Sequence, residues 1–338
     1  SLRFNTDTAH LEYFRGNTIG WTEIEAELTE PLGGGTGSNT GTGTRMCIVG
    51  GYSGPVLNTI DYITISTLGD AEDFGDLAAG TYSGGAIGNS TRGFKLGGYS
   101  PGISNAVHVF TFASKGDAVD SINLAAVTAY PGEFSNEVRG VLAGNSHPGA
   151  TNVIQYISLS TTSDGQDFGD LSYATLAPAG CASSTRGIFA GGQPSPGVNT
   201  ISFVTIMTTG DATDFGDMTY STNQNMACSN ATRGLISGGG SPGSMNNIIN
   251  FITIATTGNA IDFGDMSYTR ANASNDGASS STRGIFSGGG SPATDNDNSR
   301  MRSIEKVEIA TLGNTVDFGD MTDHASNHHV MSNAHGGL

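Results

Sequence analysis

The sequence predicts an all-β protein whose main part is a closed ring of six four-stranded sheets, a β-propeller. Three observations support this prediction. The composition is rich in Gly, with 51 residues, and only 13% of the residues are charged, which favours short strands joined by tight turns. One motif recurs six times through most of the chain. The two ends of the repeated region complement each other, so that the ring can close.

The repeat is marked by Thr-Arg-Gly followed by apolar residues and Gly-Gly. Its copies begin at positions 44, 91, 138, 185, 232 and 282, which places the first five 47 residues apart and the last 50 residues after the fifth. The copy at position 138 is a degenerate Val-Arg-Gly. An interval of this length is typical of one propeller blade.

Each copy contains four short strands. In the copy at position 185, the strands predicted from apolar and turn residues are 186–192, 200–207 and 212–218, and a further strand, 225–230, precedes the next marker. The third strand of a unit carries apolar residues on both faces, as in the segment 248–254, so both faces must be covered. Units that are sandwiched between neighbours in this way indicate a propeller or a linear solenoid.

The chain ends favour the closed ring over the solenoid. The first copy lacks the strand that precedes the marker in the other copies, whereas the C-terminal segment 329–334 has the pattern of that strand. The C-terminal strand is therefore expected to complete the first blade, which removes the exposed edges of an open array.

The Gly-Gly pair after an apolar strand, the small-residue strand before it and the long third strand resemble the kelch repeat, and the resemblance covers residues 44–338. The resemblance implies a kelch-like propeller that binds a protein or a glycan; a few relatives are copper oxidases. The sequence departs from the kelch pattern by having Phe in Asp-Phe-Gly-Asp where kelch repeats carry Trp. These residues are Phe74, Phe168, Phe215, Phe263 and Phe318. The second unit has Asp120-Ser121-Ile122-Asn123 instead.

Residues 1–32 are predicted to form a small β-hairpin module, and the Gly/Thr-rich segment 33–43 a flexible linker to the propeller at 44–338. The module resembles one that recurs in bacteriophage tail-fibre and other virion proteins, through Arg-Phe-Asn-Thr-Asp-Thr, then Leu-Glu and an aromatic residue, then Gly and Trp. About 30 residues cannot bury a core of their own. We therefore expect Phe4, Tyr13, Phe14 and Trp21 to pack against another copy, another virion protein or the propeller.

Charge and composition exclude several classes of function. A formal net charge of -17 would repel phosphate backbones and anionic membrane surfaces. No apolar run reaches the roughly 18 residues that cross a bilayer, and no signal-peptide pattern opens the chain. We expect no nucleic-acid binding and no membrane insertion. Because the chain begins at Ser1 without a Met, we expect it to be an excised or processed part of a longer polypeptide.

The cysteines and acidic repeats are predicted to be structural. Cys47, Cys181 and Cys228 are an odd number without zinc or disulfide spacing, so we expect buried, unpaired thiols. The acidic segments, such as 211–217, would suit calcium loops, since hard cations prefer carboxylate and carbonyl oxygens. The alternative is that Asp and Gly simply build the hairpin turns, and their repetition around the ring favours this interpretation.

No constellation for catalysis or for a cofactor stands out. Four histidines gather near the C-terminus, but their spacing fits no familiar metal site; they are His324, His328, His329 and His335. No Ser or Cys nucleophile is placed beside a His and a carboxylate, so no enzyme activity and no cofactor are predicted. The six marker arginines would suit an axial anion site, or each would pair with a repeated Asp between blades, and we favour the pairing.

A binding face is expected on the rim formed by the turns between second and third strands and by the linkers between blades, because departures from the repeat concentrate there. The last unit departs most, through the long turn 291–302. We select this turn and the neighbouring linkers as a candidate binding site, the alternative being a solvated loop that tolerates insertion. The candidate residues are Asp295, Asp297, Arg300, Arg302, Arg270 and His324.

Together the repeat and the two resemblances predict a phage virion structural protein, such as a tail-fibre, spike or decoration subunit, located on the particle surface. Its expected partners are other virion subunits, a host-surface glycan or a host-surface protein, with self-association through the N-terminal module. One alternative is a subunit of an extracellular filament or a surface adhesin. Another is a glycan-active propeller enzyme, although no acid and base pair can be named for it.

Overall fold

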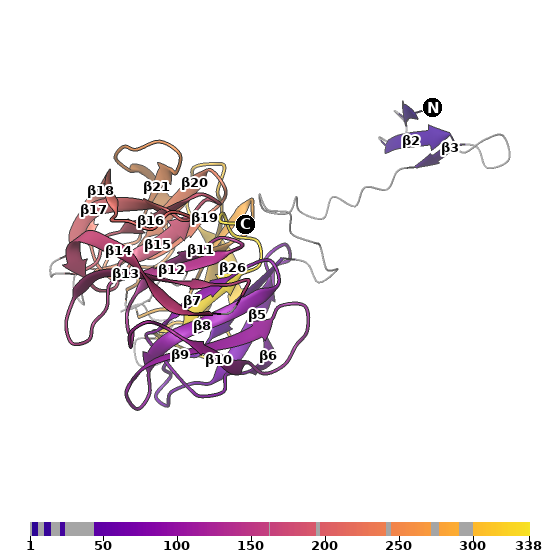
Figure 1. The fold of residues 1–338 in the computed structure, drawn as a ribbon. Coiled ribbons are helices and arrows are strands. Elements are labelled where there is room, and N and C mark those ends of the chain that lie inside the picture. Colours follow the sequence, from indigo (N-terminus) through magenta and orange to yellow (C-terminus); the bar gives the residue numbers. More distant parts are fainter. Residues whose placement is uncertain are drawn as a thin grey trace. The chain divides into compact units, whose positions relative to one another are not determined.

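The computed structural model describes the backbone of residues 2–5, 10–14 and 21–23, and residues 44–161, 163–193, 197–240, 245–271, 277–290 and 300–338 in full. The chain divides into two compact units, residues 1–31 and residues 32–338. The regular structure of the described residues consists of β-strands (Figure 1). None of these residues belongs to a helix of the length and apolar character needed to span a membrane.

The first unit contains a three-stranded antiparallel sheet in the order β1 (Leu2–Asn5), β2 (His10–Phe14) and β3 (Trp21–Glu23). Phe4 is opposite Leu11, and Phe14 is opposite Trp21 in the register of the backbone. All four aromatic residues of the predicted module therefore lie on these strands. What their side chains pack against stays a prediction.

The strands of the described part of the second unit form six four-stranded antiparallel sheets, which are the blades of a propeller. Blades one to three consist of β27 (His329–Ser332), β4 (Arg45–Val49), β5 (Thr59–Thr64) and β6 (Glu72–Asp76); β7 (Gly85–Gly88), β8 (Arg92–Tyr99), β9 (Ile103–Thr111) and β10 (Val119–Asn123); and β11 (Gly132–Ser135), β12 (Arg139–Ala143), β13 (Thr151–Ser158) and β14 (Ser163–Thr175). Blades four to six consist of β15 (Ala179–Ala182), β16 (Arg186–Ala190), β17 (Val198–Thr205) and β18 (Thr213–Thr222); β19 (Met226–Ser229), β20 (Arg233–Ser237), β21 (Ile248–Thr253) and β22 (Ile261–Asp265); and β23 (Gly277–Ser279), β24 (Arg283–Ser287), β25 (Ser303–Glu308) and β26 (Val316–Asp320). The predicted six-bladed, all-β propeller is confirmed.

The ring closes through the C-terminal strand. β27 is the innermost strand of blade one, where Val330 is opposite Ile48 and Ser332 is opposite Met46 of β4. In Figure 1 the yellow C-terminal end of the chain lies among the strands of the ring. This pairing confirms the closure predicted from the chain ends, and it ties the last blade to the first.

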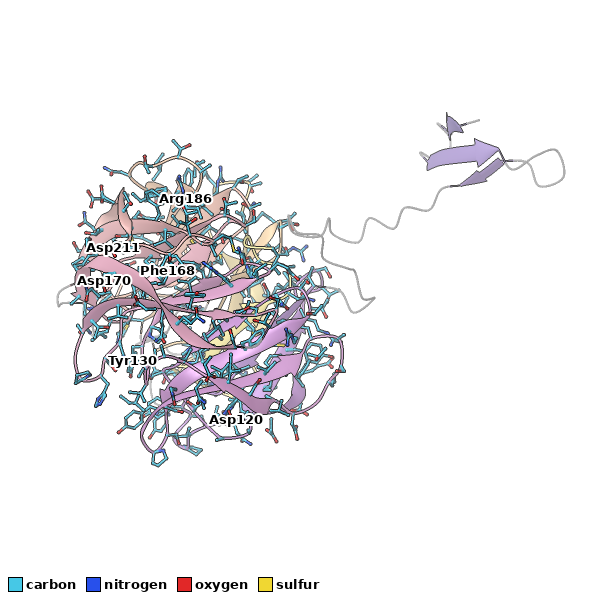
Figure 2. All side chains as sticks on the ribbon, in the orientation of Figure 1. Asp120, Tyr130, Phe168, Asp170, Arg186 and Asp211 are labelled. Carbon is cyan, nitrogen blue, oxygen red and sulfur yellow. The ribbon has the colours of Figure 1, made fainter. Side chains whose placement is uncertain are left out.

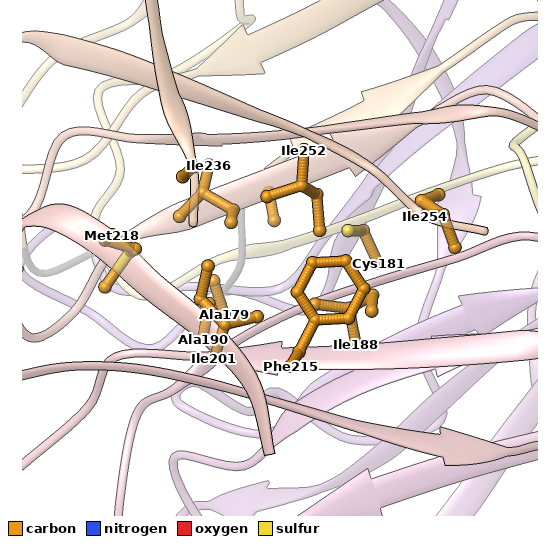
Figure 3. Packing of buried hydrophobic residues seen from close by; sticks show 12 residues of the cluster. Ala179, Cys181, Ile188, Ala190, Ile201, Phe215, Met218, Ile236, Ile252 and Ile254 are labelled. Carbon is orange, nitrogen blue, oxygen red and sulfur yellow. The ribbon is translucent and has the colours of Figure 1, made fainter. Parts of the chain in front are cut away.

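The apolar core lies between neighbouring blades. One cluster joins blades four and five, where Ile188 and Phe215 of one blade pack with Ile236 and Ile252 of the next (Figure 3). Phe215 belongs to an Asp-Phe-Gly-Asp segment, and the Phe of each such segment is buried. Complete burial of a side chain of this size stabilises the fold by about 1.5–3 kcal/mol. Because both faces of a blade are covered, the third strands are apolar on both faces.

The marker arginines link the blades through backbone carbonyl groups. The Nη1 atom of Arg186 in blade four donates to the carbonyl oxygen of Ile254 in blade five at 2.9 Å, and Arg283 of blade six donates to Ile65 of blade one at 2.8 Å. The equivalent donors and acceptors in the other blades are Arg45 to Phe112, Arg92 to Leu159, Arg139 to Ile206 and Arg233 to Ile309. The expected structural role is thus present, but the proposed Asp partners are wrong: each marker arginine donates to the carbonyl group of the residue that follows the third strand of the next blade.

The repeated acidic turns form a second link between blades. The Oδ1 atom of Asp211 accepts a hydrogen bond from the backbone N–H of Asp170 in the preceding blade at 3.0 Å, and both residues are labelled in Figure 2. An Asp or Asn makes this bond at every junction; the other acceptors are Asp70, Asp117, Asp164, Asn259 and Asn314. Beside it, Gly169 has a φ of 150°, and a Cβ there would lie 2.4 Å from the carbonyl oxygen of Gly210. The turn interpretation therefore accounts for these Asp and Gly residues.

The C-terminal residues lie over the centre of the ring. The backbone N–H of Gly336 donates to Ser229 on the innermost strand of blade five at 2.8 Å, and the Nε2 atom of His335 lies 2.8 Å from the carbonyl oxygen of Gly88 in blade two. Leu338 is buried. The cavity lined by the innermost strands is only about 50 Å³. The ring centre therefore holds side chains and the chain end rather than a ligand-sized channel.

Candidate functional site

The turns between second and third strands and the linkers between blades meet on one edge of the propeller, which we call the linker rim. In blade one, Tyr52 follows the second strand, and its backbone N–H donates to Ser326 in the linker from blade six at 2.9 Å. In blade two, the N–H of Tyr99 donates to Tyr82 in the linker from blade one at 2.8 Å. These bonds fix turns and linkers from neighbouring blades against one another.

Three tyrosine rings form a continuous row on the linker rim. The ring centres of Tyr52 and Tyr82 are 5.6 Å apart, and those of Tyr82 and Tyr99 are 5.4 Å apart. Partial burial and the neighbouring phenols raise the pKa of Tyr82 above its usual value. Tyr99 is 40% exposed, so one end of the row is open to solvent. Amphipathic rings in such positions supply contact area at low cost in conformational entropy.

Arg300 of blade six joins this row. The Cζ atom of its guanidinium lies 4.9 Å from the centre of the Tyr52 ring, which is a cation–π geometry. One predicted site residue is therefore brought from the last blade of the ring to the first. The result is a surface of three aromatic rings and one cation, which we call the tyrosine row.

The other predicted residues do not gather around Arg300. Arg270 is fully buried: its Nη2 lies 3.0 Å from a carboxylate oxygen of Glu305, and its Nη1 donates to the Gly288 carbonyl at 3.0 Å. Its guanidinium is therefore not offered at the surface. Arg302 forms an ion pair of 3.3 Å with Asp320.

His324 is partly exposed, and its backbone N–H donates to the carboxylate of Asp323 at 2.8 Å. Asp295 and Asp297 lie outside the described residues. The predicted turn thus contributes Arg300 to the site, while the structure does not test its acidic residues.

The C-terminal histidines occupy separate environments. His329 accepts a hydrogen bond from the backbone N–H of Gly84 through Nε2 at 2.8 Å, and His335 lies at the ring centre. Burial and the nearby Arg270 cation lower the pKa of His328 to about 3. Among the residues that the structure describes, no three His, Cys, Asp or Glu side chains are grouped as metal ligands.

A serine and a histidine meet inside the protein rather than at a catalytic surface. The Oγ of Ser287 lies 3.1 Å from Nε2 of His328, a distance that a nucleophile and its base require. Both side chains have no exposed surface, however, so a substrate cannot reach them in this conformation. The cysteines are equally inaccessible: all three are unpaired and buried, as predicted, and burial raises the pKa of Cys181 to about 12.

The sequence contains a signal for the tyrosine row that lies in residue type rather than in loop length. Gly-Gly is followed by Tyr in blades one and two, at Tyr52 and Tyr99, whereas the other blades have Ser, Gln or Gly after the corresponding pair. A rim residue that departs from its repeat toward a large aromatic side chain is a sign of recognition. Departures from the repeat in residue type are therefore as informative about the candidate site as the greater length of the turn in blade six.

Comparison with known proteins does not suggest a function for the chain. No model of a protein family matches the chain, and no curated protein matches it at a significant level. The fold and the tyrosine row are therefore the observations from which a function can be argued.

Proposed function

We propose that the chain is a virion structural protein of a bacteriophage, a tail-fibre, spike or decoration subunit, that binds its partner through the linker rim of the propeller. The tyrosine row carries the proposal. It is a row of aromatic rings and one cation that is exposed at Tyr99 and partly exposed elsewhere, and aromatic and Arg side chains are typical of binding hot spots. The partner is a host-surface glycan or protein, or another virion subunit, and no catalytic step is assigned to the chain.

Two sequence resemblances support the assignment to a virion. The N-terminal module resembles those of phage tail-fibre proteins, and in the proposal it attaches the propeller to the particle or to a second copy of the chain. The kelch-like repeat supports binding by the propeller.

Cryo-electron microscopy of the native particle that contains the chain tests the proposal. Propellers at fibre tips or on the capsid, with the linker rim facing outward or contacting another subunit, are the expected result. Propellers stacked in a host-encoded filament would contradict it and favour the filament subunit instead.

Binding by the full chain to the surface that the particle attaches to gives a second test. Tyr99→Ala is expected to reduce binding at least tenfold, since loss of a hot-spot aromatic costs about 2 kcal/mol or more. Tyr268→Ala is the matched control, because Tyr268 lies in the linker from blade five and is 36% exposed but belongs to no tyrosine row. Equal losses in both variants would contradict the role of the row.

A further inference from the structure

The junctions between blades contain a slot behind the linker rim, and at the junction of blades four and five a tyrosine occupies it. Tyr220, near the end of β18 in blade four, donates to the carbonyl oxygens of Gly238 and Ile248 in blade five at 3.2 and 3.1 Å. The preceding residue, Thr219, donates to Oδ1 of Asn250 from both its N–H and its hydroxyl at 2.9 Å. Two side chains from the end of β18 thus fill the slot and pair with the next blade.

The junction of blades three and four is built in the same way. Tyr173 is the equivalent of Tyr220, and its hydroxyl donates to the carbonyl oxygen of Gly191 in blade four at 3.0 Å. Burial raises the pKa of Tyr173 to about 12, as expected for a phenol enclosed in a slot. A para-substituted phenol is therefore the group that this part of the fold accepts at two of its junctions.

The junction of blades one and two keeps the slot but lacks both side chains. The linker reads Leu77-Ala78-Ala79-Gly80-Thr81, so that Ala78 stands where blade four has Thr219 and Ala79 where it has Tyr220. A cavity of about 290 Å³ lies there. Its lining includes Gly97 and Ala106, the counterparts of the two residues whose carbonyl groups accept the Tyr220 hydroxyl in blade five.

A buried imidazole, whose Nδ1 atom has no hydrogen-bond partner among the described residues, lines this cavity. It belongs to His108, which is 7% exposed. The equivalent position is polar in every blade, and in several blades a residue of the preceding linker pairs with it: Thr219 with Asn250, Thr322 with Asp61, and Thr128 with Gln155. Ala78 has no hydroxyl, so it cannot do the same for His108.

The groups beside His108 set the kind of ligand that fits. His108 is opposite Lys95 on one neighbouring strand and Asp120 on the other. Burial and Lys95 lower the pKa of His108 while Asp120 opposes the shift, so the imidazole is neutral at pH 7 and can accept a hydrogen bond. The exposed Asp120 carboxylate lines the cavity and disfavours phosphates and other anions. Thr81, Ser100 and Ser104, which carry hydroxyl groups, also line the cavity.

We propose that this cavity binds the side chain of a tyrosine presented by a partner protein, whose ring takes the place that Tyr220 fills in blade five and whose hydroxyl reaches His108. The volume is at the lower end of the range of ligand pockets, about 300–1,000 Å³, which suits one ring rather than an extended ligand. Ala78 and Ala79 are exposed at its mouth, and Tyr82 and Tyr99 of the tyrosine row adjoin Thr81 and Ser100. The inference rests on the function proposed above, because a partner reaches the cavity only by docking on this rim.

Titration of the full-length chain with N-acetyl-L-tyrosinamide, followed by calorimetry and ligand-observed NMR, tests the pocket directly. Saturable binding is expected, and N-acetyl-L-phenylalaninamide should bind about 10- to 100-fold more weakly, because the phenol hydroxyl pairs with buried polar groups. Equal affinity for the two amides, or no binding of the tyrosine amide, would overturn the proposal. Binding of methyl hexosides in preference to both amides would also overturn it and assign the cavity to a saccharide.

Substitutions locate the binding. Ala79→Tyr should abolish binding of the tyrosine amide by filling the slot from within, as Tyr173 and Tyr220 do at their junctions. Ala126→Tyr, at the equivalent position of the next junction, is the matched control and should leave binding unchanged. His108→Asn places the blade-five residue in the cavity and should weaken binding about tenfold. Undiminished binding by a folded Ala79→Tyr protein, checked by its thermal unfolding, would overturn the proposal, and His108→Asn decides the matter if that variant does not fold.

The pocket and the tyrosine row can fail separately. If Tyr99→Ala removes attachment to the partner surface while Ala79→Tyr does not, the rim is the binding face and the pocket proposal is overturned. If Ala79→Tyr abolishes binding of both the tyrosine amide and the partner while Tyr99→Ala changes neither, the pocket proposal is supported. The proposed role of the tyrosine row in binding is then contradicted.

Discussion

The junction of blades four and five and the junction of blades one and two share their strands, their Gly-Gly turns and their hydrogen bonds between turns, yet one is filled and the other is hollow. Thr219 and Tyr220 occupy the first, and Ala78 and Ala79 leave a cavity of about 290 Å³ in the second. Buried polar groups are normally paired inside proteins. Both junctions keep a buried polar atom without a hydrogen-bond partner, Nδ1 of His108 in the hollow one and Nδ2 of Asn250 in the filled one. The two junctions therefore differ in the space in front of this polar residue, which Thr219 and Tyr220 occupy in one and no side chain of the described residues occupies in the other.

The largest expected effect concerns a third type of junction. Between blades five and six, Arg270 stands where the four preceding junctions have Thr81, Thr128, Thr175 and Thr222, and it forms a buried ion pair with Glu305. Arg270→Met should lower the free energy of unfolding by about 3–5 kcal/mol, because it leaves a buried carboxylate without its cation. Arg270→Thr with Glu305→Asn restores the residues of the junction between blades four and five and should cost clearly less. Urea unfolding measures both, and equal losses would show that the pair is not coupled.

Hollowing the filled junction should have the next largest effect. Tyr220→Ala is expected to destabilise the protein by about 2–3 kcal/mol, less than for a fully buried aromatic because Tyr220 is partly exposed. Tyr220→Phe keeps the ring and loses only its hydrogen bonds, at about 1 kcal/mol. Chemical denaturation of the two variants separates filling from pairing. If both cost the same, the ring itself contributes little to the junction.

The junction of blades six and one should make stability depend on pH. There His328 stands where the junction of blades four and five has Asn225, and its pKa is lowered to about 3. Since the unfolded chain binds a proton near pH 6.5 and the folded chain does not, this contribution is complete above pH 6.5 and is lost as the pH falls toward 3. Between pH 7 and pH 5 the loss should be about 1–2 kcal/mol.

His328→Asn tests this pH dependence. The variant should show a weaker fall in the free energy of unfolding between pH 7 and pH 5 than the parent chain, whatever its stability at pH 7. Parallel pH profiles for the two proteins would contradict the assignment of the effect to His328.

The smallest expected effect is a gain. Ala79→Tyr should raise the free energy of unfolding by about 0.5–2 kcal/mol by filling the cavity, and Tm should rise with it. Ala126→Tyr should not, because Gln155 already reaches Thr128 in that junction at 2.9 Å. A loss of stability in Ala79→Tyr would mean that the slot between blades one and two cannot accommodate a ring like those of Tyr173 and Tyr220.

The sequence predicted most of the fold because the information for it is periodic. Six copies of the marker gave the number of blades, and the unmatched strand at 329–334 gave the closure that β27 makes with β4. The three buried, unpaired thiols also followed from residue type and spacing. The candidate site was predicted less well: Arg300 reaches the tyrosine row, whereas Arg270 is buried against Glu305.

The sequence by itself determined the repeat, and with it the strands, the turns and the order of blades, because these depend on residues close together in the chain. Only the tertiary structure decided what meets between blades. It showed that Arg186 pairs with a carbonyl 68 residues away, that Arg300 lies on the ring of Tyr52, and that Ala78 and Ala79 leave His108 facing a cavity. Those contacts depend on the shapes of side chains from different repeats and on the distances between them. The spacing of residues within one repeat carries no information about either.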